Sequence, residues 1–374
     1  MLLKHLVFIA AVGSLFFILG ACGDTSPILI GFSGQLTGKT SDIGVFGRNG
    51  AMLAIEKINE TGGINGRPLK LIAEDDGNTP DGALKADKIL IDAGVVAIIG
   101  HMTSSQTMAA LPFINKNGMV LISPTTSTPE LTNKNDLFFR TMVENPIQSK
   151  VLADYARSAL DFNTIVTVKE SDNENYSFTF TDNFSKQFIE LGGDVLKSIT
   201  YSSSANTGWD PIIDSLITLK PDAILLTCPA HDAASIVQQI RNAGLKTRIL
   251  SGAWAYTDKL LQWGGHSVEG MIFVIEYATD NPKPAFIKFR KSYRNRFGAN
   301  PNFASALSYE SVLALAKGLQ ITNGSASGLA DAMAPSGIIS GVVGDFKLNE
   351  YGDVERNVFL VTIKEGEFRT IEMR

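Results

Sequence analysis

The chain has few of the residue types on which catalytic and metal sites are usually built. Its 374 residues include two cysteines and four histidines. The histidines beyond the N-terminal segment, His101, His231 and His266, stand far apart and show no metal-ligand spacing. The Gly-x-Ser-x-Gly motif of a hydrolase nucleophile is absent as well. We therefore expect a protein that is not an enzyme and that holds neither a metal nor a cofactor.

Long runs of one charge are also missing. The formal net charge is -5, from 33 basic and 38 acidic residues, and this mild acidity gives no support to nucleic-acid binding. Residues 34–40 end in Gly-Lys-Thr, but three residues separate the glycines where a Walker A loop needs four. Nucleotide binding is therefore not predicted. Cys228 lies in an apolar run and is interpreted as a packing residue.

The N-terminus carries the single long apolar stretch of the sequence. A charged start, an apolar core of roughly 14 residues and small residues before Cys22 predict a signal peptide over 1–21, too short for a membrane-spanning helix of about 20. Leu19-Gly20-Ala21-Cys22 resembles a bacterial lipobox. It implies an acylated Cys22, a tether over 22–27 and a place in the periplasm or on the cell surface, with the lipid as the only membrane attachment. A plain signal peptide is the alternative.

After the tether, short apolar runs alternate with amphipathic segments. Strands are predicted at 29–32, 69–73, 95–99 and 120–122, with helices at 47–60, 81–93 and 106–115 between them. A polar passage at 135–146 follows, and the alternation then restarts. This rhythm is typical of an α/β protein with two doubly wound, mainly parallel sheets, one in each lobe.

Two hydroxyl-rich turns follow the third and fourth of these strands. In an open parallel sheet both turns lie at the carboxyl ends of strands, where such folds bind ligands. Each turn precedes a predicted helix or loop with free N–H groups, which favour an anion such as a carboxylate. The alternative is that the hydroxyls only cap helices. The candidate ligand-binding residues here are Met102, Thr103, Ser104, Ser105, Thr125, Thr126 and Ser127.

Other polar and aromatic residues at strand ends allow two interpretations each. Tyr176 and Trp254 follow strands of the second predicted lobe and are either ligand contacts or core residues. His101 is either a ligand contact or a satisfied turn histidine. The acidic cluster around Asp75 and Asp76 is interpreted as capping rather than as an acid–base pair.

Taken together, several motifs are similar to those of the periplasmic leucine/isoleucine/valine-binding proteins, the solute-binding components of ABC transporters. The resemblance covers nearly the whole chain after the signal peptide. It is carried by Ile30-Gly31-Phe32-Ser33-Gly34, Asn59-Glu60-Thr61-Gly62-Gly63-Ile64-Asn65-Gly66-Arg67-Pro68-Leu69, Asp75-Asp76, Ile98-Ile99-Gly100-His101, Ser104-Ser105, Ser123-Pro124, Pro129-Glu130-Leu131-Thr132, Gly244-Leu245-Lys246-Thr247 and Val268-Glu269-Gly270.

The resemblance implies a type I periplasmic binding fold whose two lobes are joined by three hinge crossings and close on a small ligand. Lobe 1 would span 28–144 and 277–353, and lobe 2 would span 145–276 and 354–374. Ser104, Thr125 and Ser127 match the family's carboxylate anchors, and Tyr176 matches a tyrosine of its second lobe. Ile43 and Met102 match residues that flank the ligand. The implied partners are ABC permease subunits, with the protein itself a monomer.

The sequence departs from this family in two places. Amino-acid binders of the family hold the ligand ammonium with a carboxylate where this chain has Ala253 and Trp254. Because a buried ammonium without a partner is costly, the ligand is either an amino acid held by another anion or an acid or amide without an amino group. Some members also carry a disulfide where this chain has Asn78 and Thr103. A ligand-sensing receptor of the same fold is the functional alternative.

Overall fold

The computed structural model describes residues 25–38, 40–205 and 208–374, and the predicted signal peptide, Cys22 and the first part of the predicted tether lie outside them. A five-stranded parallel sheet is built in the order β2-β1-β3-β4-β5. Its central strands are entirely buried because helices cover both faces, which explains their unbroken apolar sequences. The strands are β1 (Ile28–Gly34), β2 (Leu69–Asp75), β3 (Ala97–Ile99), β4 (Val120–Ser123) and β5 (Phe138–Arg140). The helices between them are α2 (Asp42–Glu60), α3 (Pro80–Asp92) and α4 (Ser104–Lys116).

A second sheet has seven strands in the order β15-β14-β10-β9-β8-β6-β7. Five of them are parallel, and β14 and β15 are antiparallel additions at one edge. The strands are β6 (Thr164–Glu170), β7 (Asp194–Tyr201), β8 (Ala223–Thr227), β9 (Arg248–Ser251), β10 (Ile272–Ile275), β14 (Phe359–Lys364) and β15 (Glu367–Met373). The helices are α5 (Asn145–Asp154), α6 (Glu174–Glu190), α7 (Asp210–Leu219), α8 (Ala230–Asn242) and α9 (Asp258–Gly264).

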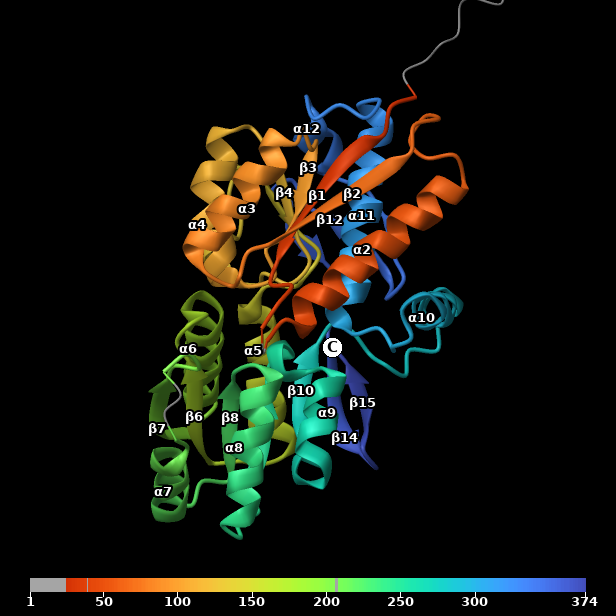
Figure 1. The fold of residues 1–374 in the computed structure, drawn as a ribbon. Helices are drawn as coiled ribbons and strands as arrows, with labels where there is room; N and C mark the ends of the chain where they lie inside the picture. The colour runs from red at the N-terminus through yellow and green to blue at the C-terminus, as the bar shows by residue number, and fades with distance from the viewer. Residues whose placement is uncertain (1–24, 39, 206–207) are drawn as a thin grey trace, which may run out of the picture.

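The remaining elements lie between β10 and β14 in the chain. Of these, α11 packs along α2 and against the first sheet, and α12 packs on α11. They are α10 (Pro284–Phe297), α11 (Phe303–Ile321), α12 (Leu329–Met333), β11 (Ile339–Ser340), β12 (Asp345–Leu348) and β13 (Val354–Glu355). We call the first sheet with α2, α3, α4 and α11 lobe 1, and the second sheet with α5 to α9 lobe 2. The two lobes lie one above the other (Figure 1).

The chain passes between the lobes at several points. It leaves lobe 1 after β5, returns after β10 to form α11, and enters the second sheet again at β14. In both lobes the parallel strands follow the same spatial order, with the first strand between the second and the third. The fold is therefore the predicted α/β architecture with a doubly wound sheet in each of two lobes. No helix among the described residues is long and apolar enough to cross a membrane.

Two elements differ from the sequence-based expectation. Strand β5 lies inside the passage at 135–146 that was predicted to be polar and irregular; its three residues are too few to show a period. Helix α2 begins at Asp42 rather than at Gly47, because its glycines serve helix packing and not a turn. A Cβ atom at Gly50 would lie 2.0 Å from the carbonyl oxygen of Ser305 in α11, so only glycine permits this approach.

Helix α10 lies beside both lobes on the side away from α4 and α6 (Figure 1). Its inner face is aromatic, and its rings belong to a continuous series of ring contacts from lobe 2 to α2, with centroid separations between 4.0 and 6.5 Å. In order, the rings are Phe368, Tyr256, Tyr277, Phe286, Phe289, Tyr293 and Phe46. We call this series the aromatic ladder.

Candidate functional site

A small cavity lies between the carboxyl ends of the two sheets. Both lobes contribute to its walls, which is the arrangement expected when the switch points of two doubly wound sheets face each other. None of the side chains that line it is charged. They are Ile43, Met102, Thr103, Ser104, Thr125, Met142 and Phe303 on the side of lobe 1, and Asn173, Tyr176, Ala253 and Trp254 on the side of lobe 2.

Most of the residues predicted from sequence meet at this cavity, and three do not line it. Ser105 donates its backbone N–H to the Asn173 side chain of lobe 2. The Thr126 hydroxyl pairs with that of Thr107 at 2.7 Å. Ser127 is fully buried behind the wall, and its backbone N–H donates to the Ser104 Oγ at 3.4 Å. These three residues therefore support the cavity wall from behind or bridge the lobes.

The first hydroxyl turn leads from β3 into α4. Helix α4 begins at Ser104, and the residue before it, Thr103, makes no side-chain cap hydrogen bond. Instead the Thr103 hydroxyl donates to the Oδ1 of Asn78 at 3.1 Å. The Thr103 hydroxyl therefore does not cap the helix. Ser104, the first residue of the helix, lines the cavity, and the hydrogen of its hydroxyl is available as a donor.

The second hydroxyl turn follows β4 and is tied to the first. The Oγ of Ser123 accepts the backbone N–H of Thr126 at 2.9 Å and donates to the carbonyl of His101 at 2.7 Å. Thr125 donates its hydroxyl to the carbonyl of Met102 at 2.8 Å. The hydroxyl of Ser127 is buried and has no hydrogen-bond partner among the described residues. A buried hydroxyl without a partner is costly.

Arg140, at the end of β5, holds the far part of the second turn in place. It is 1% exposed, pairs with Asp353 at 2.7 Å and donates to the carbonyl of Thr128 at 2.9 Å. Because β5 was not predicted, the support that Arg140 provides was not predicted either.

The opposite wall comes from lobe 2 and is aromatic. Tyr176 and Trp254 meet edge to face, with ring centroids 5.8 Å apart and planes at 89°. Burial raises the pKa of the Tyr176 hydroxyl above its ordinary value, so this group stays a neutral donor at physiological pH. The hydroxyl lies against the backbone of Ala253 and Trp254.

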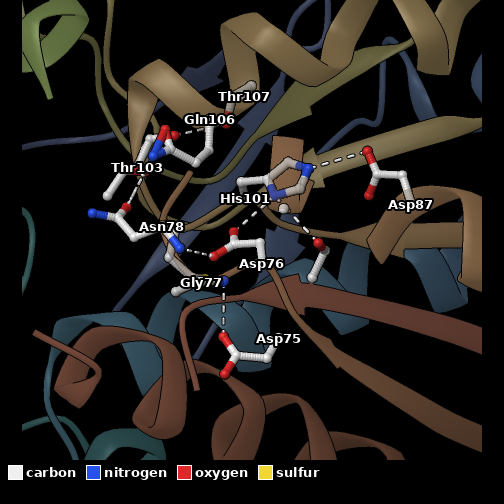
Figure 2. Close-up of polar contacts among 12 residues, drawn as sticks. Asp75, Asp76, Gly77, Asn78, Asp87, His101, Thr103, Gln106 and Thr107 are labelled. Atoms are coloured by element: carbon white, nitrogen blue, oxygen red, sulfur yellow. Dashed lines mark hydrogen bonds and ion pairs between the residues drawn. The ribbon is translucent and has the colours of Figure 1, made fainter. Parts of the chain in front are cut away.

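His101 lies beneath the first turn and does not reach the cavity. Figure 2 shows it between Asp76 and Asp87: Nδ1 donates to the Oδ2 of Asp76 at 2.9 Å, and Nε2 donates to the Oδ2 of Asp87 at 3.1 Å. Burial alone would lower the pKa of His101, but the charge of Asp87 and the hydrogen bonds with both carboxylates raise it to about 10. His101 is therefore a charged structural residue. This agrees with its interpretation as a satisfied turn histidine and not with a ligand contact.

The acidic cluster also has a structural role. Asp76 accepts the backbone N–H of Asn78 at 2.9 Å, and Asp75 accepts those of Gly77 at 2.9 Å and Leu36 at 3.0 Å (Figure 2). These bonds shape the turn that brings Asn78 to Thr103. The described residues contain no group of three or more His, Cys, Asp or Glu side chains that could hold a metal ion.

Three lining residues were not predicted from the sequence. Met142 and Phe303 belong to segments that follow crossings between the lobes, where no local pattern indicates a ligand. Asn173 stands in the polar loop before Tyr176, and its position at a strand-to-helix junction is a signal that could have identified it. The buried carboxylate of Glu170 accepts the backbone N–H of Asn173 at 3.0 Å, and burial raises the pKa of Glu170 to about 7.

Comparisons with known proteins agree with this architecture. A family model described as periplasmic binding protein matches residues 27–367. An amino acid binding protein of Pseudomonas aeruginosa is 25% identical over 345 residues, which cover 90% of either chain. A Leu/Ile/Val-binding protein homolog of Brucella melitensis is 28% identical over 335 residues, or 88% of either chain.

Solved structures show the same fold. A leucine-binding protein of Thermotoga maritima superposes with a TM-score of 0.85 at 25% identity, over 92% of this chain and 98% of its own. An ABC transporter solute-binding protein of R. palustris, solved in complex with benzoate, has a TM-score of 0.85 at 20% identity, over 93% and 96% of the two chains. At that identity the second likeness concerns the fold alone.

Proposed function

Because the chain belongs to the periplasmic binding protein family, whose members bind solutes and catalyse no reaction, we propose that it is the solute-binding protein of an ABC transporter. The ligand is a small molecule with a carboxylate, held between lobes that close on it by hinge motion. ABC permease subunits then receive the ligand from the closed form. The names of the relatives, which include an amino acid binding protein and a Leu/Ile/Val-binding protein homolog, support a small ligand with a carboxylate.

The hydroxyl of Ser104 is the observation that carries the carboxylate part of the proposal, because Ser104 lines the cavity in the first turn of α4. Its oxygen accepts the backbone N–H of Ser127, and its hydrogen is available to an acceptor. A ligand carboxylate in the cavity would accept this hydrogen bond. Hydrogen bonds to a charged acceptor contribute about 1.5 to 3 kcal/mol each.

The neutral lining favours an acid without an amino group over an α-amino acid. Opposite the hydroxyl turns, the walls are formed by rings and apolar side chains such as Trp254, Ile43 and Phe303. No carboxylate lines the cavity to pair with a ligand ammonium. Burying an unpaired ammonium costs several kcal/mol, which a ligand of this size could not easily recover.

The cavity is small, and we therefore consider small ligands, namely leucine-sized aliphatic acids and single-ring aromatic acids. We also propose that the chain divides into lobes at the boundaries given above and that Cys22 is acylated and anchors the protein to a membrane. The exchange Cys22→Ala should therefore release the protein from the membrane fraction.

Matched ligands test the proposal directly. Leucine and 4-methylpentanoate differ only by the α-amino group, and benzoate and benzamide differ in the carboxylate. Thermal shift followed by calorimetry of residues 23–374 should show binding of 4-methylpentanoate or benzoate, because a ligand that binds only the folded state raises the melting temperature.

The outcomes separate the ligand classes. Binding of the acids but not of leucine supports the neutral cavity as described. Tight binding of leucine would mean that an anion outside the lining holds the ammonium. If benzamide bound as tightly as benzoate, this would contradict the proposal that the site recognises a carboxylate.

A further inference from the structure

The two lobes are fastened to each other beside the cavity by a small set of hydrogen bonds. The backbone N–H of Ser105 in lobe 1 donates to the Oδ1 of Asn173 in lobe 2 at 3.1 Å. The Ser105 hydroxyl donates to the Oδ1 of Asn175 at 3.0 Å, and the backbone N–H of Asn175 donates back to the Oγ of Ser105 at 3.3 Å. The Nδ2 of Asn175 also donates to Glu130 at 3.0 Å.

One of these bonds supplies a missing helix cap. The first N–H groups of α4 have no partner within the helix, and Thr103 offers them no side-chain cap. The carboxamide oxygen of Asn173 takes the N–H of Ser105 instead, so the cap of a lobe 1 helix is a side chain of lobe 2. When the lobes separate, this cap is lost and the N–H group returns to water.

The backbone of Asn173 is held by its own lobe. Asn173 is 3% exposed, and its backbone N–H donates to the buried carboxylate of Glu170. Its carbonyl accepts the backbone N–H groups of Tyr176 and Ser177 at 3.1 and 3.0 Å at the start of α6. Lobe 2 therefore positions the backbone from which the Asn173 side chain reaches Ser105.

We propose that Asn173 and Asn175 are positioning residues that form an interlobe clasp on Ser105 and set how much of the ligand-free protein is closed. This inference rests on the proposed closure of the lobes on a ligand. Asn175 bonds to Ser105 and Glu130 and does not line the cavity, so loss of its bonds weakens the binding of every ligand by the same factor, whereas Asn173 also lines the cavity. An apparent affinity falls in proportion to the closed fraction, whatever the ligand is.

The decisive variant is the double exchange N173A/N175A. Without the interlobe bonds, the radius of gyration of the ligand-free protein in X-ray scattering should increase. The single variant N175A leaves the cavity lining unchanged and should lower the affinities for benzoate and 4-methylpentanoate together by roughly ten-fold. N183A is the matched control, since Asn183 lies on the same helix and bonds to Thr179 within lobe 2. It should leave both measurements unchanged.

A second variant separates the clasp from the chemistry of the cavity. N173D retains an acceptor for the Ser105 N–H, and its negative charge suits the N-terminus of a helix. It should therefore keep the ligand-free protein compact while weakening acids selectively, because a carboxylate then faces the ligand's own. An unchanged radius of gyration in N173A/N175A would overturn the clasp. Failure of wild-type protein to bind either acid would instead overturn the proposed ligand class and leave the scattering result in force.

Discussion

At the scale of single residues, the hydroxyl of Ser104 is the polar group that the cavity depends on most. It lies in the first turn of α4, faces the cavity and receives the N–H of Ser127. Both hydroxyl turns therefore meet at this one oxygen. Its hydrogen remains available to a ligand, which is the property that a carboxylate-binding site needs.

We predict that Ser104→Ala weakens the binding of a carboxylate ligand by about 1 to 3 kcal/mol, because a charged acceptor loses a donor. Calorimetry with benzoate and 4-methylpentanoate would measure the change. Ser327→Ala, an exposed serine away from the cavity, is the control. Equal affinities in wild type and Ser104→Ala would remove Ser104 from the site.

His101 gives a second prediction at this scale. Its pKa of about 10 lies above the unperturbed 6.5, so the folded protein binds this proton more tightly than the unfolded chain does. The resulting stability is fully present below about pH 6.5 and is lost as the pH rises through 10. Urea unfolding at several pH values and the imidazole resonances in NMR should show it. Deprotonation of His101 near pH 6.5 would contradict this assignment.

The sequence predicted the hydroxyl turns and the aromatic wall because each lies where a strand ends, and strand ends can be recognised locally. It did not predict Met142 or Phe303, since their place in the cavity depends on how distant segments pack. His101 had two interpretations until Asp87, fourteen residues away in α3, was seen to reach its ring.

At the scale of elements, the turn before α3 and the turn before α4 are joined by the pair of Asp76 with His101 and by a hydrogen bond between Asn78 and Thr103. The family resemblance places a disulfide of some members at the positions of Asn78 and Thr103. In this chain the two side chains are neighbours that share a hydrogen bond.

We predict that the double exchange N78C/T103C forms a disulfide and stabilises the protein by about 2 kcal/mol. Closing a loop of 25 residues contributes about 3 kcal/mol, and a cysteine at the positive φ of 54° costs about 1. Melting temperatures with and without reductant would measure the difference, with N78C alone as control. A lower melting temperature for the oxidised form would count against this geometry.

Element boundaries were the weaker part of the sequence-based analysis. Helix α2 was predicted to begin at Gly47 but begins at Asp42, and its Gly50 is the residue that lets α11 approach. Strand β5 escaped notice because short buried strands carry no period. Both errors have one cause. The sequence pattern reports only local structure, whereas the residues at these positions are determined by contacts with segments far along the chain.

At the scale of the whole molecule, the region where the lobes join contains a buried carboxylate. Glu276 follows β10 and accepts the backbone N–H of Val143, near the crossing after β5, at 2.7 Å. Arg356, which pairs with Glu310 at 2.5 Å, contributes its charge nearby. Burial raises the pKa of Glu276 to about 7, although the Val143 N–H and Arg356 oppose this.

The raised pKa predicts how stability depends on pH. Between about pH 4.5 and 7 the unfolded chain loses this proton while the folded protein keeps it, so stability falls as the pH rises through this window. Glu276→Gln keeps an acceptor for Val143 and should remove that part of the slope in thermal melts. Glu190→Gln, an exposed site, is the control. An identical slope in wild type and Glu276→Gln would exclude Glu276 as its source.

The aromatic ladder along α10 gives the molecule two unlike sides. Ring pairs have preferred arrangements, but several arrangements are favourable and each pair contributes only about 0.5 to 1.5 kcal/mol beyond its burial. On the opposite side, the bonds of Ser105 to lobe 2 require one geometry. We therefore expect the lobes to rotate about the aromatic ladder at α10 and to separate when the interlobe bonds of Ser105 beside α4 break. The gap between the lobes should then widen first beside α4, and a solute would enter there.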